Sequence, residues 1–481
     1  MKTLRHLTLS ALLACTLCLA GQPATSHGIT SYTVNPRHEQ QTIEGWGVSL
    51  CWWANMCGKW SDDKIDEILT WLTSPDGLNY NIFRYNIGGG DDPRHASCEP
   101  HHMAKGKGLR AEMEGFKDAP EAPYSWERDA AQRKIMLKIR EKRPDAIFEA
   151  FSNSCPYYMT VSGCCGGNQQ ATQDNLRSDC YTPFAQYLTD VCRHYKDTYG
   201  LEFRTLDPFN EPMTDYWYAG GTQEGCHFDV ESQIAFIKTL HPLLKKAGLS
   251  TQISASDETS VAQTVCDMEA FISSGILPLI GQINTHSYKA DNKARRRLHD
   301  LCKQHNKPLW MSEVGDGGWG IAGNLKLAQK LFDDMNVLMP KGWVDWQYVE
   351  EDNDQWCMVR GNFGAQSYER VKNFYVRQHC SKYLKQGYVM LRSTNPQTLL
   401  AKSAAADQIV IVALNTTDTP KTYKADLSAF RQVGQPAEAV ITNKQADMAA
   451  YTGYTLKAGQ QLYYTLPPLS IVTMVIPVAA P

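Results

Sequence analysis

The sequence lacks an excess of charge of either sign. Its 48 Lys and Arg residues face 51 Asp and Glu residues, which gives a net charge of −3. Electrostatic binding to nucleic acid or to an anionic membrane surface needs a surplus of positive charge. The basic run at residues 295–297 falls in a helical pattern and is interpreted as a solvated face. The charge balance therefore argues against nucleic acid and membrane-surface partners.

After its first 26 residues the sequence also lacks any apolar run long enough to form a transmembrane helix. The first 26 residues resemble an export signal, because Lys2 and Arg5 precede an apolar core at residues 7–19. Two processing routes remain open, cleavage after Ser26 and lipidation at Cys15, and cleavage is favoured. We expect a secreted or periplasmic protein, with a lipid anchor at Cys15 as the alternative and no integral membrane segment.

Internal repeats and low-complexity tracts are absent as well. A hydrophobic content of 43% over 481 residues is sufficient for a large barrel and a smaller domain, and it argues against a disordered chain. The sequence is rich in aromatic residues, with 12 Trp and 23 Tyr. Because aromatic rings pack well against the apolar C–H faces of sugars, this composition favours a neutral ligand.

Cysteine is abundant, with 15 residues, of which Cys15 and Cys18 lie in the export signal. An exported protein can form disulfides, and the candidates are the pair Cys51 and Cys57 and the group formed by Cys155, Cys164, Cys165 and Cys180. A second cluster contains His95, Cys98, His101 and His102. Its spacing matches no structural zinc pattern, so no metal site is predicted there.

Apolar strands and amphipathic helices alternate through most of the chain. Strand patterns occur at residues 41–50, 80–87, 146–151, 251–255, 282–285, 308–312 and 343–349, and one more begins at Leu201. Eight strands with helices between most of them are the pattern of a (β/α)8 TIM barrel, an α/β fold. The expected barrel domain spans residues 27–382, after the signal peptide at residues 1–26.

From about Tyr383 the periodicity changes to short strands separated by turns. The pattern predicts strands at residues 409–414, 422–427, 437–442, 461–466 and 471–476, without a helix between them. This indicates an appended C-terminal β-sandwich domain at residues 383–481, and residues 32–34 are expected to add a strand to it. No cluster of tryptophans marks this domain as a separate sugar-binding module.

Two glutamates stand at the ends of predicted barrel strands. Glu211 lies in the sequence Asn-Glu-Pro, where Pro212 stops the strand and Asn210 offers a neutral hydrogen-bonding group. Glu313 closes the strand at residues 308–312 and precedes a glycine-rich loop. Because the active sites of such barrels lie at the carboxyl ends of the strands, the two residues predict paired-carboxylate chemistry.

Other polar and aromatic residues share this strand-end position or the loops that follow it. They are Trp52, Trp53, Arg84, Asn86, Asn153, Tyr157, Tyr158, Trp217, Asp257, Glu258, His286, Tyr288, Trp346, Gln347 and Tyr348. Each of these residues could instead have a purely structural role. Arg84 could form an ion pair, His286 could be a hydrogen-bonded buried histidine, and Trp346 could belong to the core. For Asp257 and Glu258, a contact with substrate and a scaffolding role in the loop are equally supported.

Several motifs together resemble glycoside hydrolase family 30. They are the two strand-end glutamates, FRYNIGGG, FSNSCPYYM, THSY and the appended sandwich, and the likeness extends over the whole mature chain. GWGVSLCWWA and MTVSGC are most similar to the endo-β-1,6-galactanase branch of that family. The family usually has two prolines after the position of Ser154, whereas this sequence has Cys155-Pro156, which leaves the contacts of Tyr157 open.

The resemblance implies roles for the matching residues. Glu211 is expected to be the general acid/base and Glu313 the nucleophile of a retaining hydrolysis. Asn210 is expected to bind the sugar 2-hydroxyl, Arg84 to orient Glu313, Tyr288 to donate a hydrogen bond to Glu313, and His286 to position the acid/base. Trp53, Asn153, Tyr157, Trp217 and Trp346 are further expected substrate contacts.

The physical chemistry of the pair supports these roles. A retaining enzyme places its two carboxyl groups about 5 Å apart, so that one attacks the anomeric carbon while the other protonates the leaving oxygen. The negative charge of Glu313 is expected to raise the pKa of Glu211, and Arg84 is expected to keep Glu313 ionised.

The sequence therefore predicts a retaining glycoside hydrolase that cleaves β-linked polysaccharide and needs no cofactor and no metal. Endo-β-1,6-galactanase is the favoured activity. The alternatives are a β-1,6-glucanase, another family 30 activity such as xylanase or glucosylceramidase, and a non-catalytic carbohydrate-binding protein. The last alternative predicts the loss of one carboxylate, and both are present.

Overall fold

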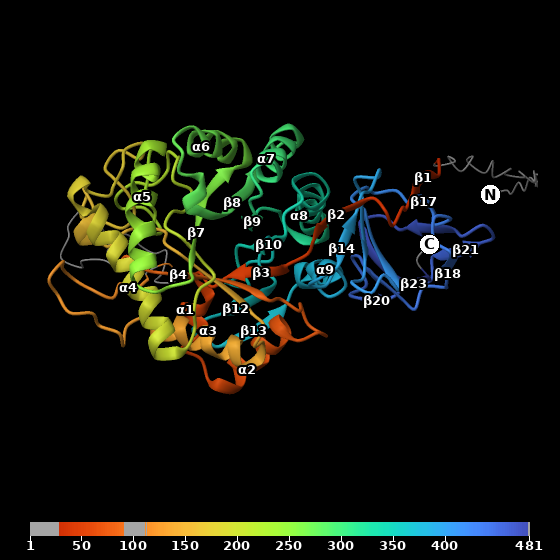
Figure 1. Cartoon of the computed structure of the whole chain (residues 1–481). Helices are drawn as coiled ribbons and strands as arrows, with labels where there is room; N and C mark the ends of the chain where they lie inside the picture. Colours follow the sequence, from red (N-terminus) through yellow and green to blue (C-terminus); the bar gives the residue numbers. More distant parts are fainter. Residues whose placement is uncertain (1–27, 91–110, 112, 480–481) are drawn as a thin grey trace, which may run out of the picture.

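The computed structural model describes residues 28–90, 111 and 113–479, and it has two parts, a barrel and a sandwich (Figure 1). The predictions on the export signal and on the cluster of His95, Cys98, His101 and His102 concern residues outside those that the structure describes. Eight parallel strands close into a barrel in the order β10-β3-β4-β5-β6-β7-β8-β9. The predicted fold class, a TIM barrel followed by a β-sandwich, is confirmed.

The barrel strands follow the predicted sequence order. They are β3 (Gly45–Ser49), β4 (Ile82–Asn86), β5 (Ile147–Phe151), β6 (Thr205–Asp207), β7 (Gln252–Ser260), β8 (Ile280–Lys289), β9 (Leu309–Glu313) and β10 (Gly342–Asp345). β7 and β8 run well past their predicted ends at residues 255 and 285, and their pairing shifts register between Ser256 and Ser260. Polar residues fill these extensions, which is why the apolar pattern did not reveal them.

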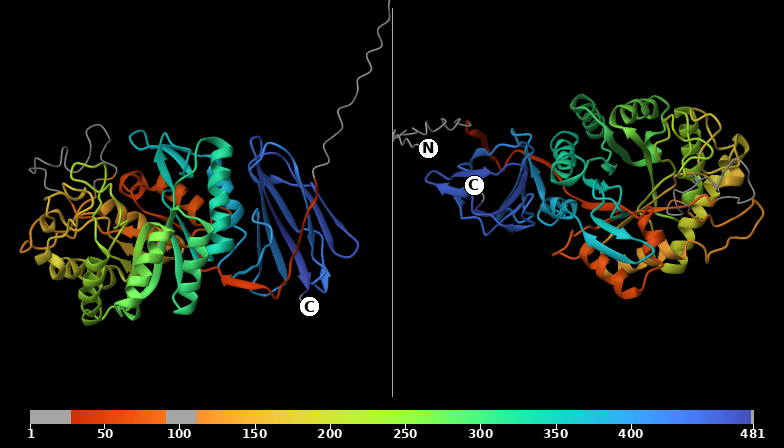
Figure 2. Two further views of the ribbon diagram at one scale, coloured as in Figure 1. Left: turned by 90° about the horizontal axis from the view of Figure 1, so that it is seen from above. Right: turned by 180° about the vertical axis from the view of Figure 1, so that it is seen from behind.

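Helices surround the barrel between most of its strands (Figure 2). They are α1 (Trp53–Cys57), α2 (Asp62–Thr73), α3 (Ala130–Lys142), α4 (Tyr181–Tyr199), α5 (Val230–Lys246), α6 (Val261–Ser273), α7 (Asn292–Gln304), α8 (Gly320–Asp333) and α9 (Lys372–Ser381). α4 is typical, since Phe184, Leu188, Val191 and Tyr195 form its buried face at helical spacing. Short 3-10 turns occur at Tyr157–Met159, Ser178–Cys180 and Leu277–Leu279, and a π-helical turn at Asp334–Leu338 follows α8.

The sandwich is built from both ends of the chain. One sheet has the order β1 (Thr30–Thr33), β17 (Lys421–Asp426), β22 (Gln461–Leu466) and β21 (Tyr454–Lys457). The other has the order β2 (Glu39–Thr42), β14 (Val389–Leu391), β15 (Thr398–Lys402), β16 (Gln408–Asn415), β23 (Ser470–Ala479), β19 (Glu438–Thr442) and β20 (Ala449–Ala450), and β18 (Gln432–Val433) pairs with β23.

The N-terminal segment therefore crosses the sandwich before it enters the barrel. β1 pairs in parallel with β17, which confirms the strand expected at residues 32–34. β2 was not predicted as a separate strand, and it pairs with β14 rather than leading straight into the barrel. Figure 1 shows this segment in red, running from the sandwich to β3. A small sheet of β11 (Val349–Glu351), β12 (Val359–Asn362) and β13 (Ser367–Arg370) after the last barrel strand was also not predicted.

The predicted pairing of Cys51 with Cys57 is wrong. Both thiols are free and buried, and they belong to different apolar clusters, Cys51 with Trp52 and Phe151 and Cys57 with the main barrel core. Cys155 and Cys180 are also free, whereas Cys164 is disulfide-bonded.

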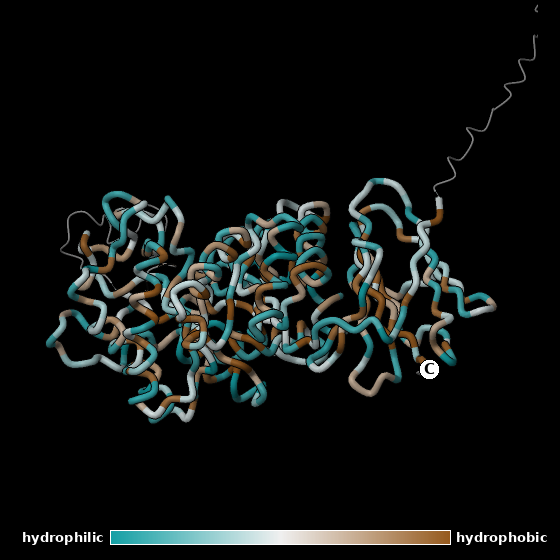
Figure 3. Tube along the Cα trace, turned by 45° about the horizontal axis from the view of Figure 1, so that its top comes forward, coloured by the Kyte–Doolittle hydropathy of each residue, from teal (hydrophilic) through white to brown (hydrophobic). Residues whose placement is uncertain are grey.

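Hydrophobic segments run through the barrel strands and the two sandwich sheets, and hydrophilic segments form much of the outer loops (Figure 3). Apart from the main barrel core, a second cluster fills the sandwich and includes Tyr32, Tyr423 and Tyr464. Among the residues that the structure describes, no helix is both long and apolar enough to cross a membrane.

His379 joins the barrel to the sandwich. It lies on α9, is fully buried, and its two ring nitrogens lie 2.8 Å from Thr473 Oγ1 and 3.0 Å from Thr442 Oγ1 on the sandwich strands β23 and β19. Burial lowers the pKa of His379 to about 3. The folded protein therefore holds this imidazole in its neutral form.

We expect this contact to make folding sensitive to acid. Below the unfolded pKa of about 6.5 the unfolded chain binds a proton that the folded chain excludes, so stability falls as the pH drops toward 3, by up to roughly 4–5 kcal/mol. His379→Gln keeps neutral hydrogen-bonding groups and should flatten the dependence of Tm on pH between 8 and 4. His38→Gln, at an exposed histidine, is the control. An unchanged slope in His379→Gln would contradict this account.

Candidate active site

Glu211 follows β6 at the carboxyl end of the barrel. Its backbone lies in the left-handed region with φ 49°, which is uncommon for a residue other than glycine, and its N–H donates to Asp257 C=O at 2.9 Å. Trp217 Nε1 and Thr214 Oγ1 donate to the Glu211 carbonyl at 3.0 and 2.8 Å. Backbone and side-chain donors thus fix a strained position, as is common in active sites.

The Glu211 carboxylate receives two side-chain hydrogen bonds. His286 Nδ1 lies 2.9 Å from Oε1, and the Tyr216 hydroxyl donates to Oε2. Glu211 is 7% exposed, so the carboxylate is almost enclosed and still reachable. Its neighbours hold one orientation of the carboxyl group, which suits a group that exchanges protons with a bound molecule.

Glu313 is the last residue of β9 and faces the same space. Tyr288 Oη donates to its Oε1 at 3.1 Å, and Arg84 Nη1 lies 3.5 Å from its Oε2. His286 Nδ1 is 3.6 Å from Oε1. Single ligand atoms of Glu211, His286 and Glu313 lie within 4.8 Å of one another. The structure therefore brings together the two glutamates that the sequence placed at separate strand ends.

Arg84 lies beneath Glu313 and is completely buried. Its Nε donates to Glu149 Oε1 at 2.8 Å, its Nη1 to Ser312 C=O at 3.2 Å, and its Nη2 to Asp257. The guanidinium also stacks over the Phe151 ring at 4.2 Å. Burial by itself would lower the pKa of Arg84, but Asp257, Glu149 and Glu313 raise it above its ordinary value. Arg84 is thus a permanent cation shared among three carboxylates.

His286 connects the acidic groups. Besides Glu211 and Glu313, its Nε2 lies 3.5 Å from Asp257 Oδ1. Burial opposes protonation, but the negative charges of Glu313 and Asp257 and the hydrogen bond to Glu211 raise the pKa of His286 to about 10. At neutral pH the ring is therefore a second buried cation, and both of its nitrogens bear protons.

The pKa of Glu313 is raised in this structure, whereas the sequence predicted that Arg84 keeps Glu313 ionised. Burial, the largest cause, and the charge of Glu211 raise the pKa of Glu313 to about 7, against the opposing effects of His286 and Arg84. Arg84 was expected to keep Glu313 ionised. It lowers the pKa of Glu313 less than burial raises it, because Glu149 and Asp257 share its charge at shorter distances.

Asp257 and Glu258 act as scaffolding in this structure, which decides between the two roles left open. Asp257 is fully buried between Arg84, His286 and Ser312. Glu258 accepts from the Met213 N–H at 3.2 and 3.3 Å, so it holds the turn that follows Glu211. Burial and the neighbouring Asp267 raise the pKa of Glu258 well above its usual range.

Three buried amide oxygens near the strand ends have no hydrogen-bond partner among the described residues. They are Asn153 Oδ1 after β5, Asn210 Oδ1 after β6 and Gln347 Oε1 after β10. Buried polar atoms are normally satisfied by protein or by a ligand. Three such atoms at the catalytic end of the barrel indicate a ligand with several hydroxyl groups, and Asn210 stands directly beside Glu211.

The predicted aromatic contacts divide into two groups. Trp346 is partly exposed and packs edge-on against Trp52, with ring centroids 4.9 Å apart. Trp53 is 1% exposed, packs against Tyr348 and donates its Nε1 hydrogen to Ser49 C=O at 2.8 Å. The predicted contact of Trp53 with a sugar is therefore wrong, because Trp53 begins α1 and its ring lies in the barrel core.

Tyr157 and Trp217 are also occupied by protein contacts. The Tyr157 hydroxyl donates to Asp118 C=O at 3.0 Å, and its ring packs edge-on against Tyr158. Trp217 is buried and holds the Glu211 carbonyl, so it positions the acidic residue rather than lining open space.

Two residues of the site, Tyr216 and Glu149, were not predicted from the sequence. Tyr216 reaches Glu211 and also lies 2.9 Å from Thr259 Oγ1. Glu149 on β5 accepts hydrogen bonds from Thr205, Ser254 and Asn284 in addition to Arg84. Glu149 could have been predicted, because it is a carboxylate inside a strand at a position that faces the barrel axis. For Tyr216, in a loop, the sequence offered no comparable signal.

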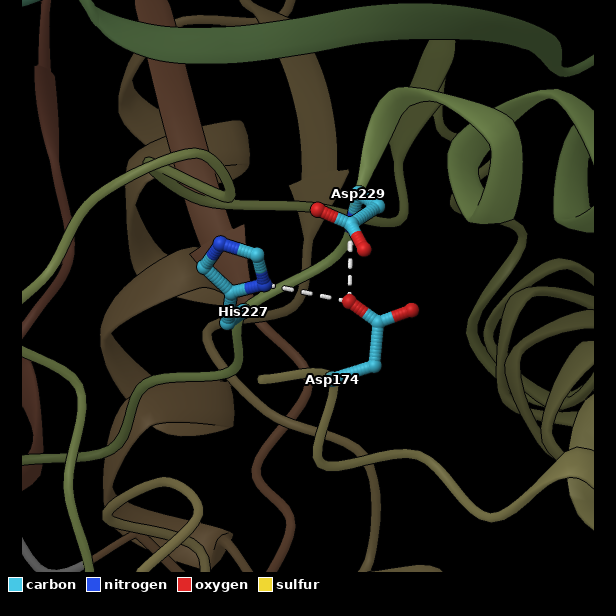
Figure 4. Close-up of side chains that lie close together, drawn as sticks. All are labelled: Asp174, His227 and Asp229. Atoms are coloured by element: carbon cyan, nitrogen blue, oxygen red, sulfur yellow. Dashed lines mark hydrogen bonds and ion pairs between the residues drawn. The ribbon is translucent and has the colours of Figure 1, made fainter. Parts of the chain in front are cut away.

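A second group of potential metal ligands contains neither of the two glutamates. Asp174, His227 and Asp229 point toward one another (Figure 4). Asp174 Oδ1 accepts from the Asp229 N–H at 2.7 Å and lies 3.0 Å from His227 Nδ1, and Oδ2 accepts from Ser232 Oγ. Both oxygens thus bind donors at the start of α5, so the group is explained as a helix cap supplied by a distant loop.

Comparison with known proteins places this site in a family. Residues 29–270 match O-Glycosyl hydrolase family 30. An endo-β-1,6-galactanase of Hypocrea rufa is 31% identical over 420 residues, which are 84% of this chain and 85% of that protein. The chain belongs to glycoside hydrolase family 30. As a member of that family it is a glycoside hydrolase, and its expected substrate class is polysaccharide.

Similarity to more distant proteins extends over nearly the whole chain. An endo-1,6-β-D-glucanase of Aspergillus fumigatus is 21% identical over 92% of this chain and 86% of that protein. The catalytic domain of GH30 xylanase C from Talaromyces cellulolyticus superposes with a TM-score of 0.71 at 20% identity, covering 93% of this chain and 99% of that one. The family 30 fold thus extends over nearly the whole chain.

The charges around Glu313 predict the pH dependence of hydrolysis. If Glu313 must be ionised to react, kcat/KM falls as the pH drops below about 7. Because His286 lowers the pKa of Glu313, His286→Gln should move this acidic limb to higher pH, so that activity falls more at pH 6 than at pH 8. The measurement is a pH profile of kcat/KM on an aryl β-glycoside.

His241→Gln on the outer helix α5 is the matched control and should leave the profile in place. A profile of His286→Gln that stays in place or moves to lower pH would contradict the assigned electrostatics.

Proposed function

We propose that the protein is a retaining endo-β-1,6-galactanase in which Glu313 is the nucleophile and Glu211 the general acid/base. The observation that supports this most directly is the distance between the two glutamates, whose nearest ligand atoms lie within 4.8 Å. Retaining glycosidases place their carboxyl groups about 5–5.5 Å apart, whereas inverting enzymes leave about 6.5–9.5 Å for a water molecule.

In the first step a Glu313 oxygen attacks the anomeric carbon of the sugar. The bond from that carbon to the glycosidic oxygen breaks, and the glycosidic oxygen takes a proton from Glu211. Tyr288 and Arg84 orient the attacking carboxylate, and His286 and Tyr216 hold Glu211 toward the leaving oxygen. The products of this step are a glycosyl ester of Glu313 and the released part of the chain.

In the second step water hydrolyses the ester. Esterification removes the negative charge of Glu313, so Glu211 is free to ionise and to accept a proton from water. The water oxygen bonds to the anomeric carbon, and the ester bond breaks to restore the Glu313 carboxylate. Two displacements at one carbon retain its β configuration.

The 2-hydroxyl of the reacting sugar is assigned to Asn210. Its Oδ1 is buried beside Glu211 and has no partner among the described residues, so a sugar hydroxyl would satisfy it. Hydrogen bonds to the 2-hydroxyl strengthen in the transition state of such reactions. Asn153 Oδ1, Gln347 Oε1 and the Trp346 ring are assigned to neighbouring sugar contacts.

The choice of β-1,6-galactan is supported by the 31% identity to the Hypocrea rufa endo-β-1,6-galactanase, which extends over most of both chains. The 21% identity to an endo-1,6-β-D-glucanase makes β-1,6-glucan the second candidate. Galactose and glucose differ in the orientation of the 4-hydroxyl, and no residue identified above selects between them. A polysaccharide substrate agrees with the proposed export of the protein, by cleavage after Ser26 or with a lipid anchor at Cys15.

The test is product release from β-1,6-galactan, β-1,6-glucan and β-1,4-xylan. We expect cleavage of galactan, with the β anomer as the first product by NMR.

Glu313→Ala should lower activity by more than roughly 10⁴-fold, since it removes the nucleophile. Glu211→Gln should lower it by about 10²–10⁴-fold on polysaccharide and much less on an aryl glycoside, whose leaving group needs no proton.

Glu350→Gln, at a buried carboxylate on β11 outside this site, serves as the control for loss of folding. Cleavage of another glycan would keep the mechanism and change the substrate. An α anomer as first product, or full activity in Glu313→Ala, would refute the mechanism.

A further inference from the structure

Exposed apolar side chains gather on the catalytic face. Among the described residues, the exposed large hydrophobic side chains are Ile29, Val161, Tyr216, Tyr218 and Trp319. All except Ile29 lie on loops that follow the barrel strands β5, β6 and β9, and therefore at the end of the barrel that holds the two glutamates. Single exposed apolar residues are common, but a concentration on one functional face indicates a binding surface.

One wall of this face is formed by the loops after β5 and β6. Its most exposed large apolar side chains are Val161 at 58% and Tyr218 at 51%. Tyr216 belongs to the same wall and contacts Glu211 directly. Because Glu211 is the proposed donor of a proton to the glycosidic oxygen, this wall lies on the side of the leaving sugar.

The backbone of this wall is fixed although its side chains are exposed. Asn168 pairs with Tyr218 in a β-bridge, and its C=O accepts from the Ala219 N–H at 2.9 Å. The Cys165 C=O accepts from the Gly225 N–H at 2.8 Å. The Asp174 cap in Figure 4 ties the loop after β5 to the start of α5. The Tyr218 ring is thus presented to solvent by a rigid support, which reduces the entropy lost on binding.

The other wall contains Trp319, which is 63% exposed at the start of α8. It stands between Gly318 and Gly320, both with positive φ, in the loop that follows Glu313. Gly318 packs so closely against Gly323 that a Cβ on Gly323 would lie 2.0 Å from the Gly318 oxygen. Lys330 on α8 binds Asp316 at 3.0 Å and Tyr288 C=O at 3.2 Å, which ties this loop to the site.

We propose that Tyr218 and Trp319 are outer sugar-binding platforms on opposite walls of the site. Tyr218 would stack on a sugar on the leaving-group side, and Trp319 on a sugar beyond the other wall. The proposal rests on the proposed function and deepens it, because contacts on both walls would hold an internal segment of a glycan and favour endo cleavage. A 1,6-linkage has an additional rotatable bond, so a chain of this kind needs outer contacts to fix its position.

The test compares a long and a short substrate. Tyr218→Ala and Trp319→Ala should each raise KM for the cleaved polysaccharide roughly tenfold, equivalent to about 1.4 kcal/mol of lost apolar contact. Neither should change kcat/KM on an aryl β-glycoside, which is too short to reach both walls. Tyr218→Phe and Trp319→Phe keep a ring and should restore most of the affinity. Ile29→Ala, at an apolar residue 54% exposed and outside the catalytic face, is the control.

Binding separates this proposal from the proposed chemistry. In affinity electrophoresis with galactan, glucan or xylan in the gel, the Glu313→Ala protein should be retarded, and adding Trp319→Ala or Tyr218→Ala should reduce the retardation. If wild type cleaves none of the three glycans while retardation still depends on the platforms, the proposed function fails and the binding surface stands. If wild type cleaves a glycan and neither KM nor retardation changes in the variants, the platforms are refuted. An equal loss on long and short substrates would also refute them.

Discussion

The site depends on one buried cation, Arg84, and the carboxylates around it. Arg84 contacts Glu149, Asp257 and Glu313 from three different barrel strands, and it stacks on Phe151. A guanidinium and several carboxylates buried without one another would be strongly unfavourable, so each group requires the others. The cation also sets the shape of the site, because its planar fork fixes the directions from which Asp257 and Glu313 approach.

His286 extends this network from the barrel interior to the acid/base. It lies within ion-pair distance of Glu211, Glu313 and Asp257, and these charges keep it protonated. The positive charges of Arg84 and His286 offset the repulsion between the Glu211 and Glu313 carboxylates. Burial nevertheless raises the pKa of Glu313 to about 7.

The loops above this network have rigid backbones and exposed aromatic rings. Caps and bridges between loops distant in sequence, such as Asp174 with the start of α5 and Asn168 with Tyr218, fix the wall beside Glu211. His379 on α9 joins the barrel to the sandwich, and the N-terminal strands β1 and β2 belong to the two sandwich sheets.

The sequence alone was sufficient to predict the barrel, the sandwich and the two strand-end glutamates. Strand patterns, helical stripes and the Asn-Glu-Pro turn are local features, readable within a few residues. Tertiary structure decided which of these residues face the site. It placed Trp53 in the core, left Tyr218 and Trp319 exposed, and raised the pKa of Glu313 through burial. Burial and electrostatic environment are sums over groups from distant segments, such as Glu149, Asp257 and His286 around Arg84 and Glu313, and no local pattern contains that sum.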